Sequence, residues 1–229
     1  MTGIIAHRGF NGLYPENTHR SFEEALKLDI VGIECDVNLT ADGQVVVIHD
    51  LTVDRTSDGS GEVAQMPFDE LRQLNIGTEE DPQQIMLLDE LLDLLEQYPG
   101  KHILIETKHP SPFGAALEEA VADVLRGHGM EADERVHLIS FNPEAIQRFH
   151  RLLPELETFL LADDSFAPVG DCGAGPSVRM AKAHPELLDG RFRTYVWTVN
   201  LPKDMLWLQK HGASLIGTDL PHIALETLV

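Results

Sequence analysis

The stretch Ile30-Val31-Gly32-Ile33-Glu34-Cys35-Asp36 joins a short apolar run to two carboxylates. A run of this length and composition is typical of a strand that is buried on both faces. Side chains alternate along a strand, so Glu34 and Asp36 point to one face and Cys35 points to the other, toward surrounding helices. A strand covered on both faces indicates a parallel sheet that is enclosed by helices.

Similar apolar runs recur along the chain, and helical patterns separate most of them. We predict strands at 3–6, 30–36, 44–48, 102–106, 135–140, 156–161, 193–198 and 214–217. We predict helices from Asn17 or Thr18 to about Leu28, and at 68–73, 87–97, 114–127, 143–152 and 203–211, with a short helix at the end. The segment 163–191 is rich in turn residues and indicates no clear element.

Eight strands alternating with helices in 229 residues predict a (β/α)₈ TIM barrel. We expect residues 1–229 to form a single domain, with a small insertion at roughly 50–100 after the third strand. A doubly wound open sheet is the alternative. The chain carries neither glycine-rich nucleotide-binding fingerprint after a strand, which disfavours the nucleotide-binding versions of that sheet.

Composition excludes several classes of partner. The formal net charge is −21, and the 17 Lys and Arg residues form no cluster, so we expect neither nucleic-acid binding nor stable association with a membrane. Two cysteines, Cys35 and Cys172, are too few for a disulfide scaffold. No apolar run is long enough to span a bilayer and no signal-peptide pattern begins the chain, so a cytoplasmic location is the default expectation. The sequence indicates no oligomeric state.

Ionisable residues gather at the carboxyl ends of the first four predicted strands. These residues are His7-Arg8-Gly9, Glu34-Cys35-Asp36, His49-Asp50 and Glu106-Thr107-Lys108. In a (β/α)₈ barrel this rim is where active sites are found. The pattern therefore predicts one active site built from four strands.

Three of these residues predict a metal site. Glu34 and Asp36 lie side by side and repel each other unless a proton or a cation intervenes. Glu106 is expected two strands further along, within reach of the same rim. Three carboxylates suit a hard divalent cation, Mg²⁺ or Ca²⁺, and Mn²⁺ is also compatible. The alternative is that the acids cap helices or pair with arginine.

Two cations and two histidines complete the predicted site. Arg8 and Lys108 suit an anionic substrate oxygen such as that of a phosphate, or they simply balance the acids. His7 and His49 titrate near neutrality, so one can accept a proton while the other donates one. Their spacing does not tell which is the acid. A metal, two cations and two histidines together favour metal-assisted phosphoryl transfer.

A series of short motifs along the chain carries a resemblance to a known family. They are His7-Arg8-Gly9, Pro15-Glu16-Asn17-Thr18, Glu34-x-Asp36, Gly43 through His49-Asp50, Asp54-Arg55-Thr56, Glu106-x-Lys108, Ser140-Phe141, Trp197-Thr198-Val199-Asn200 and Gly217-Thr218-Asp219-x-Pro221. In this order they resemble the glycerophosphodiester phosphodiesterase family from end to end. The resemblance implies a (β/α)₈ barrel that hydrolyses glycerophosphodiesters, such as glycerophosphocholine or glycerophosphoethanolamine, to glycerol 3-phosphate and an alcohol.

The resemblance also implies roles for individual residues. Glu34, Asp36 and Glu106 look like metal ligands, and His7 and His49 look like the acid/base pair. Arg8 and Lys108 look like phosphate contacts, and Trp197 looks like a wall of the substrate pocket. Glu16 and Asn17 belong to the helix-start motif, where we expect them to shape the loop and cap the helix.

One departure from the family pattern lies near the last strand. The run Ser214-Leu215-Ile216-Gly217-Thr218-Asp219 lacks an acid that the family usually has there, which affects head-group preference rather than the reaction class. Two other functions stay open. One is a lysophospholipase D acting on lysolipids, which the small insertion disfavours, and the other is a non-catalytic barrel that binds a phosphate metabolite.

Overall fold

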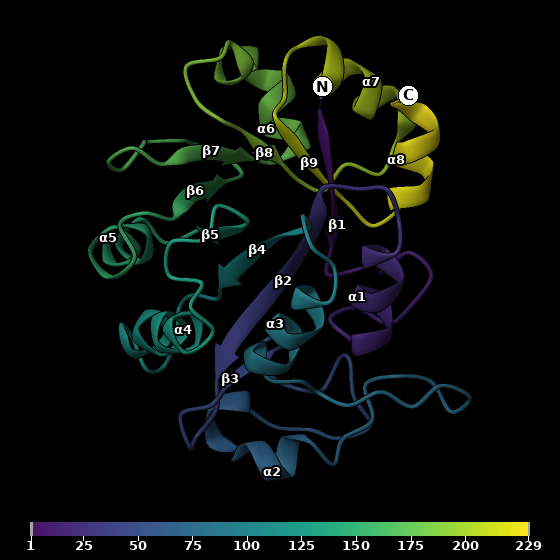
Figure 1. Ribbon diagram of the computed structural model, residues 1–229, viewed down its shortest axis with the longest axis vertical. Coiled ribbons are helices and arrows are strands. Elements are labelled where there is room, and N and C mark those ends of the chain that lie inside the picture. Colours follow the sequence, from purple (N-terminus) through teal and green to yellow (C-terminus); the bar gives the residue numbers. More distant parts are fainter. Residues whose placement is uncertain (1, 229) are drawn as a thin grey trace.

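The computed structural model describes residues 2–228 and contains one nine-stranded sheet. The strands are β1 (Gly3–His7), β2 (Gly32–Leu39), β3 (Val45–Val47), β4 (His102–Thr107), β5 (Val136–Ser140), β6 (Glu157–Ala162), β7 (Gly173–Pro176), β8 (Tyr195–Val196) and β9 (Leu215–Thr218). Eight of them are parallel neighbours in the order β7-β6-β5-β4-β2-β1-β9-β8. Two parallel bridges, Ala174 with Thr194 and Ser177 with Trp197, join the ends of this series. The fold is therefore the predicted (β/α)₈ type, as a nearly closed barrel (Figure 1).

Helices surround the barrel and pack an apolar face on its strands, except for α2, which belongs to the insertion after β3. The α-helices are α1 (His19–Leu26), α2 (Phe68–Leu71), α3 (Leu88–Glu96), α4 (Ala116–Gly127), α5 (Pro143–Leu152), α6 (Val178–Ala183), α7 (Pro202–Lys210) and α8 (Pro221–Thr227), with short 3₁₀ helices η1 (Val63–Gln65) and η2 (Pro185–Leu188). Thr18 caps α1, accepting a hydrogen bond from the Ser21 amide. Cys35 is buried on the outer face of β2 in the layer shared with the helices, as predicted.

The strand assignments contain two errors. The predicted strand at 44–48 corresponds to β3, which runs antiparallel to β2 and is not a barrel strand. The eighth barrel strand is instead β7, which lies in the segment without a clear pattern. Its sequence Gly-Ala-Gly-Pro contains no β-branched or aromatic residue, so nothing in its composition marks a strand.

The position of β3 outside the barrel brings two site residues together. Because β3 leaves the barrel, β4 pairs directly with β2, and Asp36 lies beside Glu106 in the register. The expectation that Glu106 lies two strands away is therefore wrong. The two carboxylates are closer than the sequence suggested.

The insertion between β3 and α3 builds a small apolar cluster of its own. Its members are Val46, Ile48, Val53, Val63, Leu71, Ile76 and Ile85. Figure 1 shows α2 and its neighbouring loops at one end of the molecule, beyond the carboxyl end of β2. Because Ile48 belongs to this cluster, the insertion holds the adjacent His49 over the barrel rim. Among residues 2–228, no helix has both the length and the apolar character needed to cross a bilayer.

The opposite rim carries a row of polar side chains in contact with one another. His102 Nδ1 lies 3.0 Å from His137 Nε2, and His137 Nδ1 lies 2.9 Å from Glu157, which also pairs with Arg193. Burial, the neighbouring His137 and the positive charges of Arg193 and Arg135 lower the pKa of His102, while Glu134 opposes them. The row joins the amino ends of β4, β5 and β6, and the lowered pKa of His102 favours its neutral form.

This row predicts a pH dependence of stability. A histidine whose pKa is lowered on folding binds fewer protons folded than unfolded, so its contribution is complete above about pH 6.5 and is lost as the pH falls below that value. The melting temperature of the wild type should therefore fall more steeply between pH 7.5 and pH 5 than that of His102→Asn. Differential scanning fluorimetry measures both, with exposed His184→Asn as the control. Parallel pH profiles for wild type and His102→Asn would contradict the assignment.

Candidate active site

Three buried carboxylates meet inside the carboxyl rim of the barrel. Glu34 and Asp36 come from β2 and Glu106 comes from β4, and all three side chains face the barrel interior. Each offers one oxygen within 4.8 Å of the others, and the residues are only 0–7% exposed. Arg8 and Lys108 supply two positive charges against these three negative ones. Lys108 Nζ lies 2.6 Å from Glu106 and 3.3 Å from Asp36, and Arg8 Nε lies 3.1 Å from Asp36.

The electrostatics of this cluster favour a further cation. Burial raises the pKa of Glu34 well above its ordinary value, and the charges of Asp36 and Glu106 raise it further. Burial and Asp36 raise the pKa of Glu106 to about 7. Burial alone would also raise the pKa of Asp36, but Lys108 and Arg8 lower it. In addition, Glu34 Oε1 is buried without a hydrogen-bond partner among the described residues. A divalent cation fits this set, since all donors are carboxylate oxygens.

The turn after β1 places Arg8 against the carboxylates. Its backbone N–H donates to Glu34 Oε2 at 3.0 Å, and its guanidinium donates to Glu16 at 3.0 Å. The turn is tight because Arg8 and Gly9 both have positive φ angles, of 55° and 78°. A Cβ on Gly9 would lie 2.4 Å from Ser21 Oγ, so only glycine fits there. A non-glycine residue held at positive φ is a backbone strain typical of functional sites.

The two predicted histidines share one arrangement. His7 Nδ1 lies 2.7 Å from Asp219, and His49 Nδ1 lies 2.6 Å from Asp50. Burial would raise the pKa of Asp219, but hydrogen bonds from His7, Asn200 and Asn11 lower it. This acid is therefore ionised. An ionised acceptor fixes the proton on Nδ1 and leaves Nε2 free to accept or release a proton. Burial also lowers the pKa of His49, which keeps its ring neutral at neutral pH.

One cavity of about 160 Å³ brings the predicted residues together. Polar and apolar side chains both line this cavity. They are His7, Arg8, Glu34, His49, Glu106, Lys108, Ile139, Phe141, Leu161, Tyr195, Trp197 and Thr198. Asp36 lies just beneath this lining and is fully buried. Trp197 is held by its indole N–H, which donates to the Gly175 carbonyl at 2.7 Å, and by an edge-on contact with Phe141. All eight residues predicted for the site therefore lie in or against one cavity.

The chain is similar to known proteins over nearly its whole length. Residues 7–223 match the model of the glycerophosphoryl diester phosphodiesterase family. The chain belongs to the glycerophosphodiester phosphodiesterase family. It is thus a phosphoric diester hydrolase, and a barrel that only binds a phosphate metabolite is set aside. A probable glycerophosphodiester phosphodiesterase 1 of Mycobacterium tuberculosis is 34% identical, covering 95% of this chain and 89% of that protein. The glycerophosphodiester phosphodiesterase of Bacillus altitudinis is 32% identical, covering 99% and 98%.

Solved structures of the family agree with the fold. A phosphodiesterase of Oleispira antarctica, in complex with the product sn-glycerol-3-phosphate, superposes with a TM-score of 0.89 and 27% identity, covering 100% of this chain and 97% of that one. A glycerophosphoryl diester phosphodiesterase assigned in Silicibacter pomeroyi superposes with a TM-score of 0.88 and 26% identity, covering 100% and 93%.

Several groups of this family site were missed or misjudged from the sequence. Asp50 and Asp219 orient the histidines, yet only their place in the motifs marked them. Asn17 does not cap α1; its side chain donates to Asp36 at 2.9 Å. Glu16 does shape the loop, because it pairs with both Arg8 and Arg55. Arg55 and His49 together lower the pKa of Asp50 to about 2.

A buried network lies behind Lys108. Glu118 of α4 is fully buried and accepts hydrogen bonds from His109 at 2.6 Å and from Arg148 of α5 at 2.5 Å. His109 directly follows Lys108 in the chain. Two helices of the barrel wall therefore anchor the segment that carries the active-site lysine. No sequence spacing indicates this network, since its members are brought together only by helix packing.

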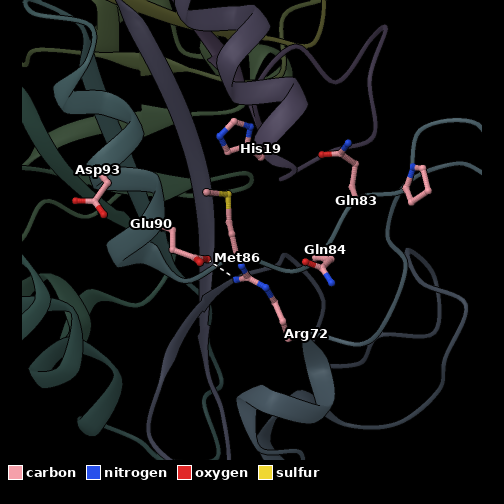
Figure 2. A pocket seen from close by; sticks show the side chains of 8 residues that line it. His19, Arg72, Gln83, Gln84, Met86, Glu90 and Asp93 are labelled. Atoms are coloured by element: carbon pink, nitrogen blue, oxygen red, sulfur yellow. Dashed lines mark hydrogen bonds and ion pairs between the residues drawn. The ribbon is translucent and has the colours of Figure 1, made fainter.

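A larger cavity, of about 550 Å³, lies elsewhere. It opens between the start of α1, residues 82–86 and α3. In Figure 2, Arg72 and Glu90 lie across it, joined by their 2.6 Å ion pair. Arg72 and Glu90 are thus already paired with each other, and the cavity contains none of the motif residues. Size alone would have pointed to the wrong place.

Proposed function

We propose that this protein hydrolyses glycerophosphodiesters, such as glycerophosphocholine or glycerophosphoethanolamine, to glycerol 3-phosphate and an alcohol. The observation that carries the proposal is the single cavity where two carboxylate-bound histidines face two cations and three buried acids. The related Oleispira antarctica phosphodiesterase, seen with sn-glycerol-3-phosphate, supports the identity of the product. All the groups come from one barrel, so we propose that residues 1–229 act as one catalytic domain.

Glu34, Asp36 and Glu106 would hold a divalent cation, Mg²⁺ or Ca²⁺ with Mn²⁺ also compatible. Bound there, such an ion polarises a non-bridging phosphate oxygen as a Lewis acid. Arg8 and Lys108 bind the phosphate oxygens and stabilise the charge that grows on them in the transition state. Both already lie against the carboxylates, so their positions are fixed before substrate arrives.

His7 and His49 move the protons. Each holds Nδ1 against a carboxylate and presents Nε2 to the cavity. One accepts the proton of the attacking hydroxyl group, and the other donates a proton to the leaving alcohol oxygen. The scheme serves equally for attack by water and for attack by a glycerol hydroxyl that gives a cyclic phosphate first. Trp197 forms the apolar wall that receives the carbon skeleton of the substrate.

Product analysis tests this proposal, because either ester bond of the phosphodiester can break. Incubation with glycerophosphocholine should release glycerol 3-phosphate and choline in equal amounts. Enzyme-coupled assays for glycerol 3-phosphate and for choline measure both, and His49→Ala serves as the inactive reference. Release of phosphocholine and glycerol instead would contradict the proposed bond specificity.

One observation favours lysolipids as second substrates. Six large apolar side chains of the described chain are exposed, and five follow the carboxyl end of a strand; these five are Leu13, Leu51, Phe113, Phe141 and Leu201. Phe141 lines the active-site cavity, and we infer that the exposed apolar side chains near it receive the acyl chain of a lysolipid. Lysophosphatidylcholine in the same choline assay tests this function. No choline release from it, beside release from glycerophosphocholine, would leave only the small substrates.

A further inference from the structure

The Tyr195 hydroxyl is a polar group of the active-site cavity that the mechanism above does not use. Tyr195 lies in β8, is 1% exposed and lines the cavity. Its hydroxyl oxygen is buried and has no hydrogen-bond partner among the described residues. Burying a hydroxyl without a hydrogen-bond partner is energetically unfavourable. A hydrogen bond to a bound ligand removes this penalty.

The position of the ring is fixed by packing. It lies against the backbone of β9, where a Cβ on Gly217 would come within 2.3 Å of the Tyr195 hydroxyl oxygen. Phe159 contacts the ring edge-on from the other side. Gly217 therefore makes the space that the phenol occupies beside the cavity.

A second unpartnered atom faces the same cavity. Glu34 Oε1 is buried without a hydrogen-bond partner among the described residues, and Glu34 lines the cavity together with Tyr195. Burial raises the pKa of Tyr195 well above its ordinary value, so the phenol keeps its proton and acts as a donor. Glu34 Oε1 belongs to the proposed cation site, so the Tyr195 hydroxyl is the group left to donate to a hydroxyl oxygen of a bound alcohol.

We propose that Tyr195 is a substrate-binding residue whose hydroxyl donates a hydrogen bond to a hydroxyl oxygen of the glycerol moiety. The inference rests on the proposed function and deepens it, because it assigns the glycerol side of the phosphodiester to the β8–β9 end of the cavity. The same donor chemistry would also serve an ordered water, and the test separates these two sources.

The test compares Tyr195→Phe with the wild type on two substrates. Loss of one hydrogen bond to the substrate should lower kcat/KM for glycerophosphocholine about 5- to 150-fold. For the propyl ester of phosphocholine, which lacks both glycerol hydroxyls, the two proteins should have equal kcat/KM. Equal activity on glycerophosphocholine overturns the proposal. An equal loss on both substrates overturns it as well, because the hydroxyl then acts through a water and not on glycerol.

Binding provides a readout that does not depend on turnover. Isothermal titration calorimetry should show glycerol 3-phosphate bound about 5- to 150-fold more weakly by Tyr195→Phe, with propyl phosphate bound equally by both proteins. The melting temperature of the variant should not fall, since the phenol contacts no protein acceptor; Tyr98→Phe is the matched control. Unchanged glycerol 3-phosphate affinity contradicts the inference. Wild-type enzyme that releases no glycerol 3-phosphate contradicts the proposed function separately.

Discussion

Replacing His49 by alanine is expected to lower kcat about 10²- to 10⁴-fold, the usual contribution of a positioned acid or base. The melting temperature should change little, because the His49 side chain is 30% exposed and its only described partner, Asp50, keeps its ion pair with Arg55. Steady-state kinetics on glycerophosphocholine measure the loss. The same experiment on His7→Ala should give a loss of similar order.

The control for this prediction is His184→Ala. His184 is half exposed, pairs with Glu186 and lies outside the cavity, so its loss should leave kcat unchanged. If His49→Ala retained near-normal turnover, His49 would have no place in the mechanism, and its contact with Asp50 would be structural.

Replacing Glu34 by glutamine is the second large effect. It removes one of three carboxylates and should weaken divalent-cation binding on the order of 100-fold or more, with turnover falling in parallel. The metal-free variant should melt at the same or a higher temperature than metal-free wild type, because burial beside Asp36 and Glu106 makes an ionised Glu34 unfavourable. The same substitution should thus preserve or increase stability while destroying function.

Calorimetry and melting curves with and without Mg²⁺ measure both effects. Glu144→Gln is the matched control, since the Glu144 side chain is 80% exposed and does not line the cavity. A Glu34→Gln variant that keeps the full rise in melting temperature on adding the ion would remove Glu34 from the ligand set.

Much of this fold was predictable because parallel strands buried on both faces have continuous apolar runs. The composition of a segment was misleading in two cases, β3 and β7. β3 has such a run, yet it pairs antiparallel with β2 beyond the barrel rim, and composition cannot separate the two environments. β7 consists of small residues that fit a crowded wall, where a Cβ on Gly173 would clash with Phe159. Its strand conformation comes from its neighbours, not from its own propensity.

Strand periodicity predicted the part of the candidate site that lies on neighbouring strands. It did not predict the residues that distant segments contribute. Alternation along β2 placed Glu34 and Asp36 on one face, and the shared rim added Glu106. The partners that orient these groups come from distant segments, as with Asp219 and His7, which are 212 residues apart. Tyr195 lies within the predicted strand 193–198 without any marked role, and only its unpartnered hydroxyl distinguishes it. Such pairings depend on tertiary packing, which local spacing does not encode.

Catalysis in the proposed mechanism depends most on a cation held by the three carboxylates. The direct measurement is the rate of glycerol 3-phosphate release from glycerophosphocholine after dialysis against EDTA, and again as Mg²⁺, Ca²⁺ or Mn²⁺ is added back. We expect release to fall to the level of the His49→Ala variant and to return with at least one of these ions. Full activity in the metal-free enzyme would contradict the central claim.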